Sequence, residues 1–144
     1  MVGVEPWDEG IPKRPASVLY ANIRSLKRHE LQLRQELAVT DARIALLTET
    51  HLKRGEKKSI VGYNQINKNR QLRGCGGVAI LIKERTLYRE RDDINTSHIE
   101  SIWAEVILNT GTLLVNAVYR PPDASMKDFL THWGKELRKV RGKR

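Results

Sequence analysis

The stretch RIALLTETHL, residues 43–52, decides how the sequence is interpreted. Four apolar residues, 44–47, predict a buried strand, and this run ends in the polar sequence TETH. A strand that only fills a core ordinarily ends in a turn residue. We therefore interpret Glu49 as a carboxylate that the strand carries to a site at its C-terminal end. For Glu49 taken alone, a solvated loop carboxylate is an equal alternative.

The residues before this stretch predict an α/β fold. Residues 17–23 alternate and are rich in β-formers, and residues 25–39 carry leucines at near-helical spacing. Ser25 is the expected N-cap of this helix. Strand, helix and strand in about thirty residues form a βαβ-like unit.

Further strands are predicted at residues 60–67, 78–82, 101–108 and 112–119. A second helix is expected after Ser125, with Asp128 completing a capping box and the apolar residues on one face. Two helices can cover one face of a sheet, so we expect a mixed β-sheet with helices on one face. The other face is expected to lack a covering layer, which predicts self-association.

Composition favours an anionic partner. The chain carries 26 Lys and Arg against 17 Asp and Glu, a formal net charge of +9, which is typical of nucleic-acid binding although it also serves solubility. The single cysteine, Cys75, excludes an intrachain disulfide and favours a reducing, intracellular compartment. No apolar run reaches the roughly 18 residues that cross a bilayer. Residues 1–16 are interpreted as an extended leader.

Two more polar residues lie at the ends of predicted strands. Asn22 ends the first strand and Tyr119 ends the last one. In open α/β sheets ligands bind at the C-terminal ends of the strands, where a carboxylate and an amide could hold Mg²⁺ and a phenol could donate to a phosphate. Taken singly, Asn22 is better explained by a turn and Tyr119 by packing.

Six stretches occur in the order seen in the endonuclease/exonuclease/phosphatase superfamily: LYANIRSL, IALLTETHL, IVGYNQI, GCGGVAILI, ESIWAEVIL and LVNAVYRPP. From about Val18 to Pro122 the chain resembles the apurinic-type endonuclease domains of non-LTR retrotransposons, which accompany reverse transcriptases. The resemblance implies a two-sheet α/β sandwich that hydrolyses DNA phosphodiesters with Mg²⁺ or Mn²⁺. It makes Glu49 and Asn22 the metal-binding and active-site residues, and Tyr119 the tyrosine that contacts the scissile phosphate.

The resemblance covers the N-terminal half of such a domain. The Gly-Asp-x-Asn and Ser-Asp-His motifs of the family do not follow Pro122, so residues 17–144 are interpreted as a truncated domain. The sequence DDINTSHI, residues 92–99, resembles these motifs only superficially and is interpreted as a polar loop. His132 is expected at the surface of the second helix.

Three functions therefore remain open. The first is a DNA endonuclease that is incomplete and weakly active or inactive. The second is a nucleic-acid-binding remnant without catalysis, and the third is a phosphatase of the same superfamily. For the first two we expect Arg70, Arg73 and Arg120 to contact nucleic acid, although a solvated charged face explains the first two of these residues equally well. A protein that acts on DNA is expected in the nucleus.

Overall fold

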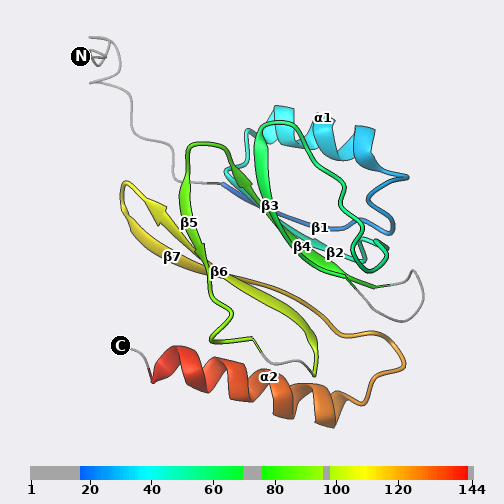
Figure 1. Ribbon diagram of the computed structural model, residues 1–144, viewed down its shortest axis with the longest axis vertical. Helices are drawn as coiled ribbons and strands as arrows, with labels where there is room; N and C mark the ends of the chain where they lie inside the picture. Colours follow the sequence, from blue (N-terminus) through cyan, green and yellow to red (C-terminus); the bar gives the residue numbers. More distant parts are fainter. Residues whose placement is uncertain (1–16, 70–75, 96–97, 143–144) are drawn as a thin grey trace.

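A computed structural model describes residues 17–69, 76–95 and 98–142 (Figure 1). The predicted leader at residues 1–16 and the predicted contacts Arg70 and Arg73 lie outside these ranges. No helix in the described part of the chain is long and apolar enough to span a membrane. The elements are β1 (Val18–Asn22), α1 (Glu30–Thr40), β2 (Ile44–Thr48), β3 (Tyr63–Lys68), β4 (Val78–Lys83), β5 (Leu87–Glu90), β6 (Glu100–Leu108), β7 (Gly111–Tyr119) and α2 (Met126–Arg141).

The strands form two sheets that face each other. A four-stranded mixed sheet has the order β1-β2-β4-β3, in which β1 is parallel to β2 and the other pairs are antiparallel. A three-stranded antiparallel sheet has the order β5-β6-β7. Ile44 and Ile80 of the first sheet pack against Ile102 and Val106 of the second. The predicted α/β two-sheet sandwich is therefore confirmed.

Helices cover the two outer sides of this sandwich (Figure 1). Leu33 and Leu37 of α1 pack on the far face of the mixed sheet, against Leu47 and Leu81. The other helix, α2, lies along the outer side of the antiparallel sheet. The layers are thus α1, mixed sheet, antiparallel sheet and α2, and both sheets have one face in a common core.

The expectation that one face of the mixed sheet lacks a covering layer in this chain is wrong. The hairpin β6–β7, with the unpredicted strand β5, forms a sheet of its own that covers this face. Alternating apolar residues define the buried side of a hairpin, but they do not say which sheet it joins. The mixed sheet extends beyond the antiparallel sheet at β1, because β7 packs on β2 and β4. We call this part of the mixed sheet the overhang. Tyr20 of β1 is consequently 63% exposed.

The first helix begins later than predicted. It starts at Glu30, with His29 at the N-cap position and no capping side chain. Arg24 and Ser25 have φ angles of +46° and +93°, which a right-handed helix cannot accommodate. The backbone N–H of Ser25 donates instead to the carbonyl of Glu49 at 2.9 Å. The loop after β1 is therefore held by the end of β2.

The second helix begins as predicted, with the Ser125 side chain accepting from the backbone N–H of Asp128. Its buried face differs from the predicted one. Glu136 is fully buried and its Oε1 accepts from Ser101 Oγ at 2.6 Å and from Trp103 Nε1 at 2.7 Å. These polar partners on β6 rotate the helix, so that three of its apolar residues are exposed: Met126, Leu130 and Leu137.

Candidate active site

The parallel pairing of β1 and β2 brings two candidate residues to one edge of the mixed sheet. Asn22, the last residue of β1, lies in register with Thr48, the last residue of β2, and Glu49 follows directly. The C-terminal ends of parallel strands meet at the same edge, which is where α/β sheets bind ligands. The backbone therefore brings Asn22 and Glu49 to the same edge of the sheet, as predicted.

The main chain at Glu49 is held on both flanks. Its carbonyl accepts from Ser25 N on one side. On the other side Thr50 N donates to the carbonyl of Gly77 at 3.3 Å, and His51 N donates to that of Gly76 at 2.8 Å. Glu49 itself has φ = +54°, a left-handed conformation that costs energy in a residue other than glycine. This strained backbone fixes the direction of the carboxylate.

Tyr119 contributes the third group from the opposite sheet. It is the last residue of β7, and its hydroxyl donates to Oε1 of Glu49 at 3.0 Å. The two residues are separated by 70 positions in the sequence, and the packing of the two sheets brings them together. The structure therefore joins a phenol and a carboxylate at the place where the sequence predicted a site.

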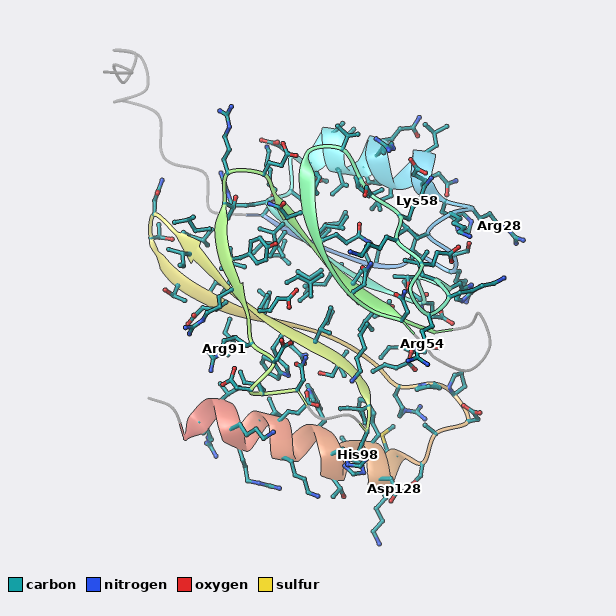
Figure 2. All side chains as sticks on the ribbon, in the orientation of Figure 1. Arg28, Arg54, Lys58, Arg91, His98 and Asp128 are labelled. Atoms are coloured by element: carbon teal, nitrogen blue, oxygen red, sulfur yellow. The ribbon has the colours of Figure 1, made fainter. Side chains whose placement is uncertain are left out.

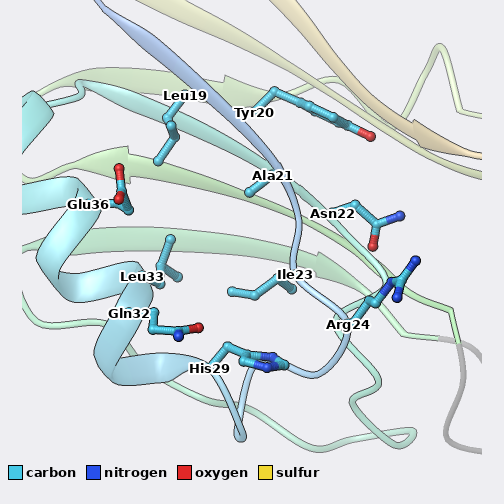
Figure 3. Close-up of a pocket in the computed structure, with 10 residues that line it drawn as sticks. All are labelled: Leu19, Tyr20, Ala21, Asn22, Ile23, Arg24, His29, Gln32, Leu33 and Glu36. Carbon is cyan, nitrogen blue, oxygen red and sulfur yellow. The ribbon is translucent and has the colours of Figure 1, made fainter.

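Asn22 lies on the same face of β1 as Tyr20 (Figure 3). Leu19, Ala21 and Ile23 turn to the other side, where a pocket of about 430 Å³ lies between β1 and α1. Glu49 and Tyr119 do not line this pocket. Asn22 does line the pocket, so the candidate active site at the strand ends adjoins the pocket at Asn22 and extends beyond it to Glu49 and Tyr119.

Cations surround this edge of the sheet. Arg24 and Arg28 follow β1, Lys53 and Arg54 follow β2, and all four are exposed. Figure 2 shows Arg28 and Arg54 on the same side of the molecule. These four residues lie in loops whose position relative to the site only the fold supplies, so their sequence pattern does not single them out.

The predicted contact Arg120 follows Tyr119 directly. Its guanidinium donates from Nη1 to the carbonyl of Ala124 at 3.1 Å and to that of Pro121 at 3.4 Å. These bonds shape the loop between β7 and α2. A contact between Arg120 and nucleic acid stays a prediction.

Two charged residues beside the site were not singled out from the sequence. Glu100 Oε1 accepts from Gly77 N at 2.5 Å, and Lys68 Nζ donates to the carbonyl of Ile99 at 2.7 Å. Burial lowers the pKa of the Lys68 ammonium, while Glu136 and Glu100 act in the opposite direction. Glu100 lies two residues before the inward-facing Ile102, so the alternation of side chains along the strand could have indicated that Glu100 also faces inward.

In the stretch 92–99, the described residues Asp93 and His98 have partners outside the candidate active site. Asp93 forms two hydrogen bonds with the guanidinium of Arg91, at 2.9 and 3.0 Å. His98, labelled in Figure 2, stacks on His132 of α2 at a ring-centroid distance of 4.4 Å. His132 is therefore half-buried, which the sequence did not predict. Ser97 lies outside the described residues.

The donor set at the site suits a hard divalent cation. A carboxylate oxygen of Glu49 and an amide oxygen of Asn22 are ligands that Mg²⁺ accepts. No group of three or more His, Cys, Asp or Glu residues that could hold a metal occurs within the described ranges. Mg²⁺ commonly keeps several waters and binds one or two carboxylates together with substrate phosphates. The residues present therefore fit Mg²⁺ as part of its ligand set.

Comparisons with known proteins agree with this fold. No protein-family model matches the chain. The chain is 31% identical over 102 residues to the RNA-directed DNA polymerase from mobile element jockey of Drosophila melanogaster, covering 70% of this chain and 11% of that protein. It superposes on the endonuclease domain of TRAS1, a telomere-specific non-LTR retrotransposon, with a TM-score of 0.72. The chain has the endonuclease/exonuclease/phosphatase fold.

This fold is shared at low sequence identity. The TRAS1 domain is 21% identical, and the superposition covers 88% of this chain and 55% of that one. The AP endonuclease LMAP from Leishmania major is 13% identical with a TM-score of 0.64, covering 96% of this chain and 51% of that one. The chain thus resembles retrotransposon endonucleases and spans about half the length of these solved structures with the endonuclease/exonuclease/phosphatase fold.

Proposed function

We propose that this chain takes part in Mg²⁺-dependent hydrolysis of DNA phosphodiesters, as the N-terminal half of a retrotransposon-type endonuclease domain. The observation that carries the proposal is the hydrogen bond of 3.0 Å between the Tyr119 hydroxyl and Glu49 Oε1. This bond brings together a carboxylate, which could bind a metal, and a phenol, which could donate to a phosphate. The fold and the similarity to the RNA-directed DNA polymerase from mobile element jockey support the proposal.

Each residue has a separate role in this proposal. Glu49 and the amide oxygen of Asn22 would hold Mg²⁺, which supplies positive charge to polarise a phosphate oxygen. Tyr119 would donate its hydroxyl to another phosphate oxygen and stabilise the charge that develops in the transition state. Without substrate, Glu49 Oε1 accepts the hydrogen bond of the Tyr119 hydroxyl, and this bond keeps the phenol pointing into the site.

Nicking of supercoiled plasmid DNA tests the proposal. We expect the protein to convert plasmid to the open-circular form slowly in Mg²⁺ or Mn²⁺ and not in EDTA. Conversion that continues unchanged in EDTA would show that the activity does not use a metal held by Glu49. If the nicking activity disappears when the protein is purified again by a different route, the activity belongs to a contaminating nuclease.

The cations around the site are expected to bind the DNA backbone. We expect a variant with both Arg28→Ala and Arg54→Ala to bind duplex DNA more weakly at every sequence. The slope of log affinity against log salt concentration should decrease in magnitude by about two, since each lost phosphate contact reduces it by about one. Fluorescence anisotropy over a salt series measures both quantities.

The matched control is Lys135→Ala, which removes an exposed cation from α2, away from the site. It should leave the salt slope unchanged. If the control and the arginine variant reduce the slope equally, DNA binding is spread over the whole basic surface and the placement at the strand ends is wrong.

A nucleic-acid-binding module without catalysis is the second candidate. The exposed arginines and lysines after β1 and β2 favour it, because they would bind phosphates whether or not cleavage follows. Salt-sensitive binding with no nicking in either metal would select it. For both candidates we propose DNA as the partner and the nucleus as the location.

We also propose that the overhang of the mixed sheet at β1 binds a further protein segment or a second copy of the chain. Its support is the exposed Tyr20 on the side of β1 that the antiparallel sheet does not reach. This contact would complete the sandwich beside the candidate active site.

A further inference from the structure

The Glu100 carboxylate is joined to the candidate active site although it belongs to the other sheet. It is the first residue of β6, and residues of the same parity, Ile102 and Ala104, face the core between the sheets. An acidic side chain on the inward side of a strand needs a partner, because burying a carboxylate without one is costly. Two connections lead from Glu100 to Glu49.

The first connection runs through the start of β4. Glu100 Oε1 accepts from the backbone N–H of Gly77 at 2.5 Å. The carbonyl of Gly77 accepts from Thr50 N, which directly follows Glu49. A Cβ atom on Gly77 would lie 2.5 Å from Thr50 Oγ1, so these two segments approach each other closely. A shift of Gly77 is therefore transmitted to the backbone of Glu49.

The second connection runs through β7. Glu100 pairs with Tyr119 in the register of β6 and β7. Tyr119 in turn donates its hydroxyl to Glu49 at 3.0 Å. The two connections form a closed circuit of Glu100, Gly77, Thr50, Glu49 and Tyr119, in which each member contacts or directly adjoins the next.

Lys68 adds a counter-charge to this circuit. It ends β3, its ammonium donates to the carbonyl of Ile99 next to Glu100, and it interacts electrostatically with Glu100. Hydrogen bonds from an N–H to a charged carboxylate are shorter and stronger than neutral ones. The distance of 2.5 Å to Gly77 N agrees with a bond of this kind.

We propose that Glu100 is a positioning residue for Glu49 and Tyr119. It binds the start of β4 to the start of β6 and thereby sets both the backbone of Glu49 and the strand that carries the phenol. Its meaning for catalysis rests on the proposed function, whereas the positioning itself can be measured without a metal or a substrate.

The test compares Glu100→Ala with the conservative Glu100→Gln in the full chain. In Glu100→Ala we expect the Gly77 amide proton to move upfield and the ¹³C resonances of the Glu49 carboxyl and the Tyr119 ring to shift. Mn²⁺ binding should weaken by about 10-fold, the low end of the loss for outer partners of a metal ligand, because Glu100 acts on Glu49 through Gly77 and Thr50. Glu100→Gln keeps an acceptor, so it should restore Mn²⁺ affinity to within about threefold of the wild type.

Glu105→Ala is the matched control. It removes another carboxylate from β6, one that pairs with Arg89 and Arg91, and it should leave the Glu49 and Tyr119 resonances in place. Unchanged Glu49 and Tyr119 resonances in Glu100→Ala would overturn the proposal. If Glu100→Ala does not fold, Glu100→Gln decides. Loss of the carboxylate charge should move the Gly77 amide proton upfield, and a proton that stays at its wild-type position would show that Gly77 does not bond to Glu100, which overturns the proposal. Failure of the wild type to bind Mn²⁺ would instead count against the proposed function.

Discussion

Replacement of Glu49 with alanine is expected to abolish Mg²⁺-dependent plasmid nicking, with a loss of at least about 10³-fold in rate. The carboxylate is the only acidic oxygen donor among the residues assigned to the site. Removing the charge that a metal provides to the transition state costs several kcal/mol, which corresponds to this factor. Nicking is measured over a time course in Mg²⁺, and metal binding by Mn²⁺ titration of the same preparations.

Two control variants make the Glu49 result specific. Glu90→Ala removes an exposed carboxylate from β5 and should nick like the wild type. Tyr119→Phe removes the donor to Glu49 while keeping the ring, so it should bind Mn²⁺ but nick more slowly. Equal nicking by the wild type and Glu49→Ala would mean that the metal ligand lies elsewhere.

Replacement of Gly77 with alanine is expected to destabilise the protein by about 2–5 kcal/mol. Gly77 has φ = +92°, which costs an L-residue about 1–2 kcal/mol. Its new methyl group would also lie 2.5 Å from Thr50 Oγ1, and overpacking of this kind costs about 1–3 kcal/mol more. Urea unfolding monitored by tryptophan fluorescence gives the change in the free energy of unfolding.

Gly62→Ala separates the two costs at Gly77. Gly62 has a similar φ of +90°, but no atom lies within 4 Å of an added Cβ, so only the backbone cost of about 1–2 kcal/mol applies. The double variant Thr50→Ala with Gly77→Ala removes the clashing oxygen and should recover part of the stability, as a double-mutant cycle reveals. A Gly77→Ala variant as stable as Gly62→Ala would show that Thr50 moves aside freely.

The sequence predicted the parts of the site that depend on local pattern. An apolar run that ends in TETH located Glu49 at the end of β2, and the predicted strand at residues 112–119 located Tyr119 at the end of β7. Ser125 and Asp128 likewise predicted the start of α2 through an ordinary hydrogen-bonding rule. Each of these features lies within a few residues of the pattern that indicates it.

Other features depend on contacts between distant segments. A hairpin with one apolar side can extend a sheet or cover it, and only the packing of Ile102 and Val106 on the mixed sheet decides between these possibilities. Left-handed backbone at Arg24, Ser25 and Glu49 carries no signal in the residue types, because glycine is what usually marks it. Long-range hydrogen bonds impose these conformations.

The distance in sequence between Glu49 and Tyr119 has a consequence for how the protein is made. Ribosomes deliver a chain from its N-terminus, and 70 positions separate the carboxylate from the phenol that contacts it. A nascent chain that has emerged only as far as β6 carries Asn22 and Glu49 but has no hydroxyl opposite them. The contact between Glu49 and Tyr119 therefore forms late in synthesis, when β7 joins β6.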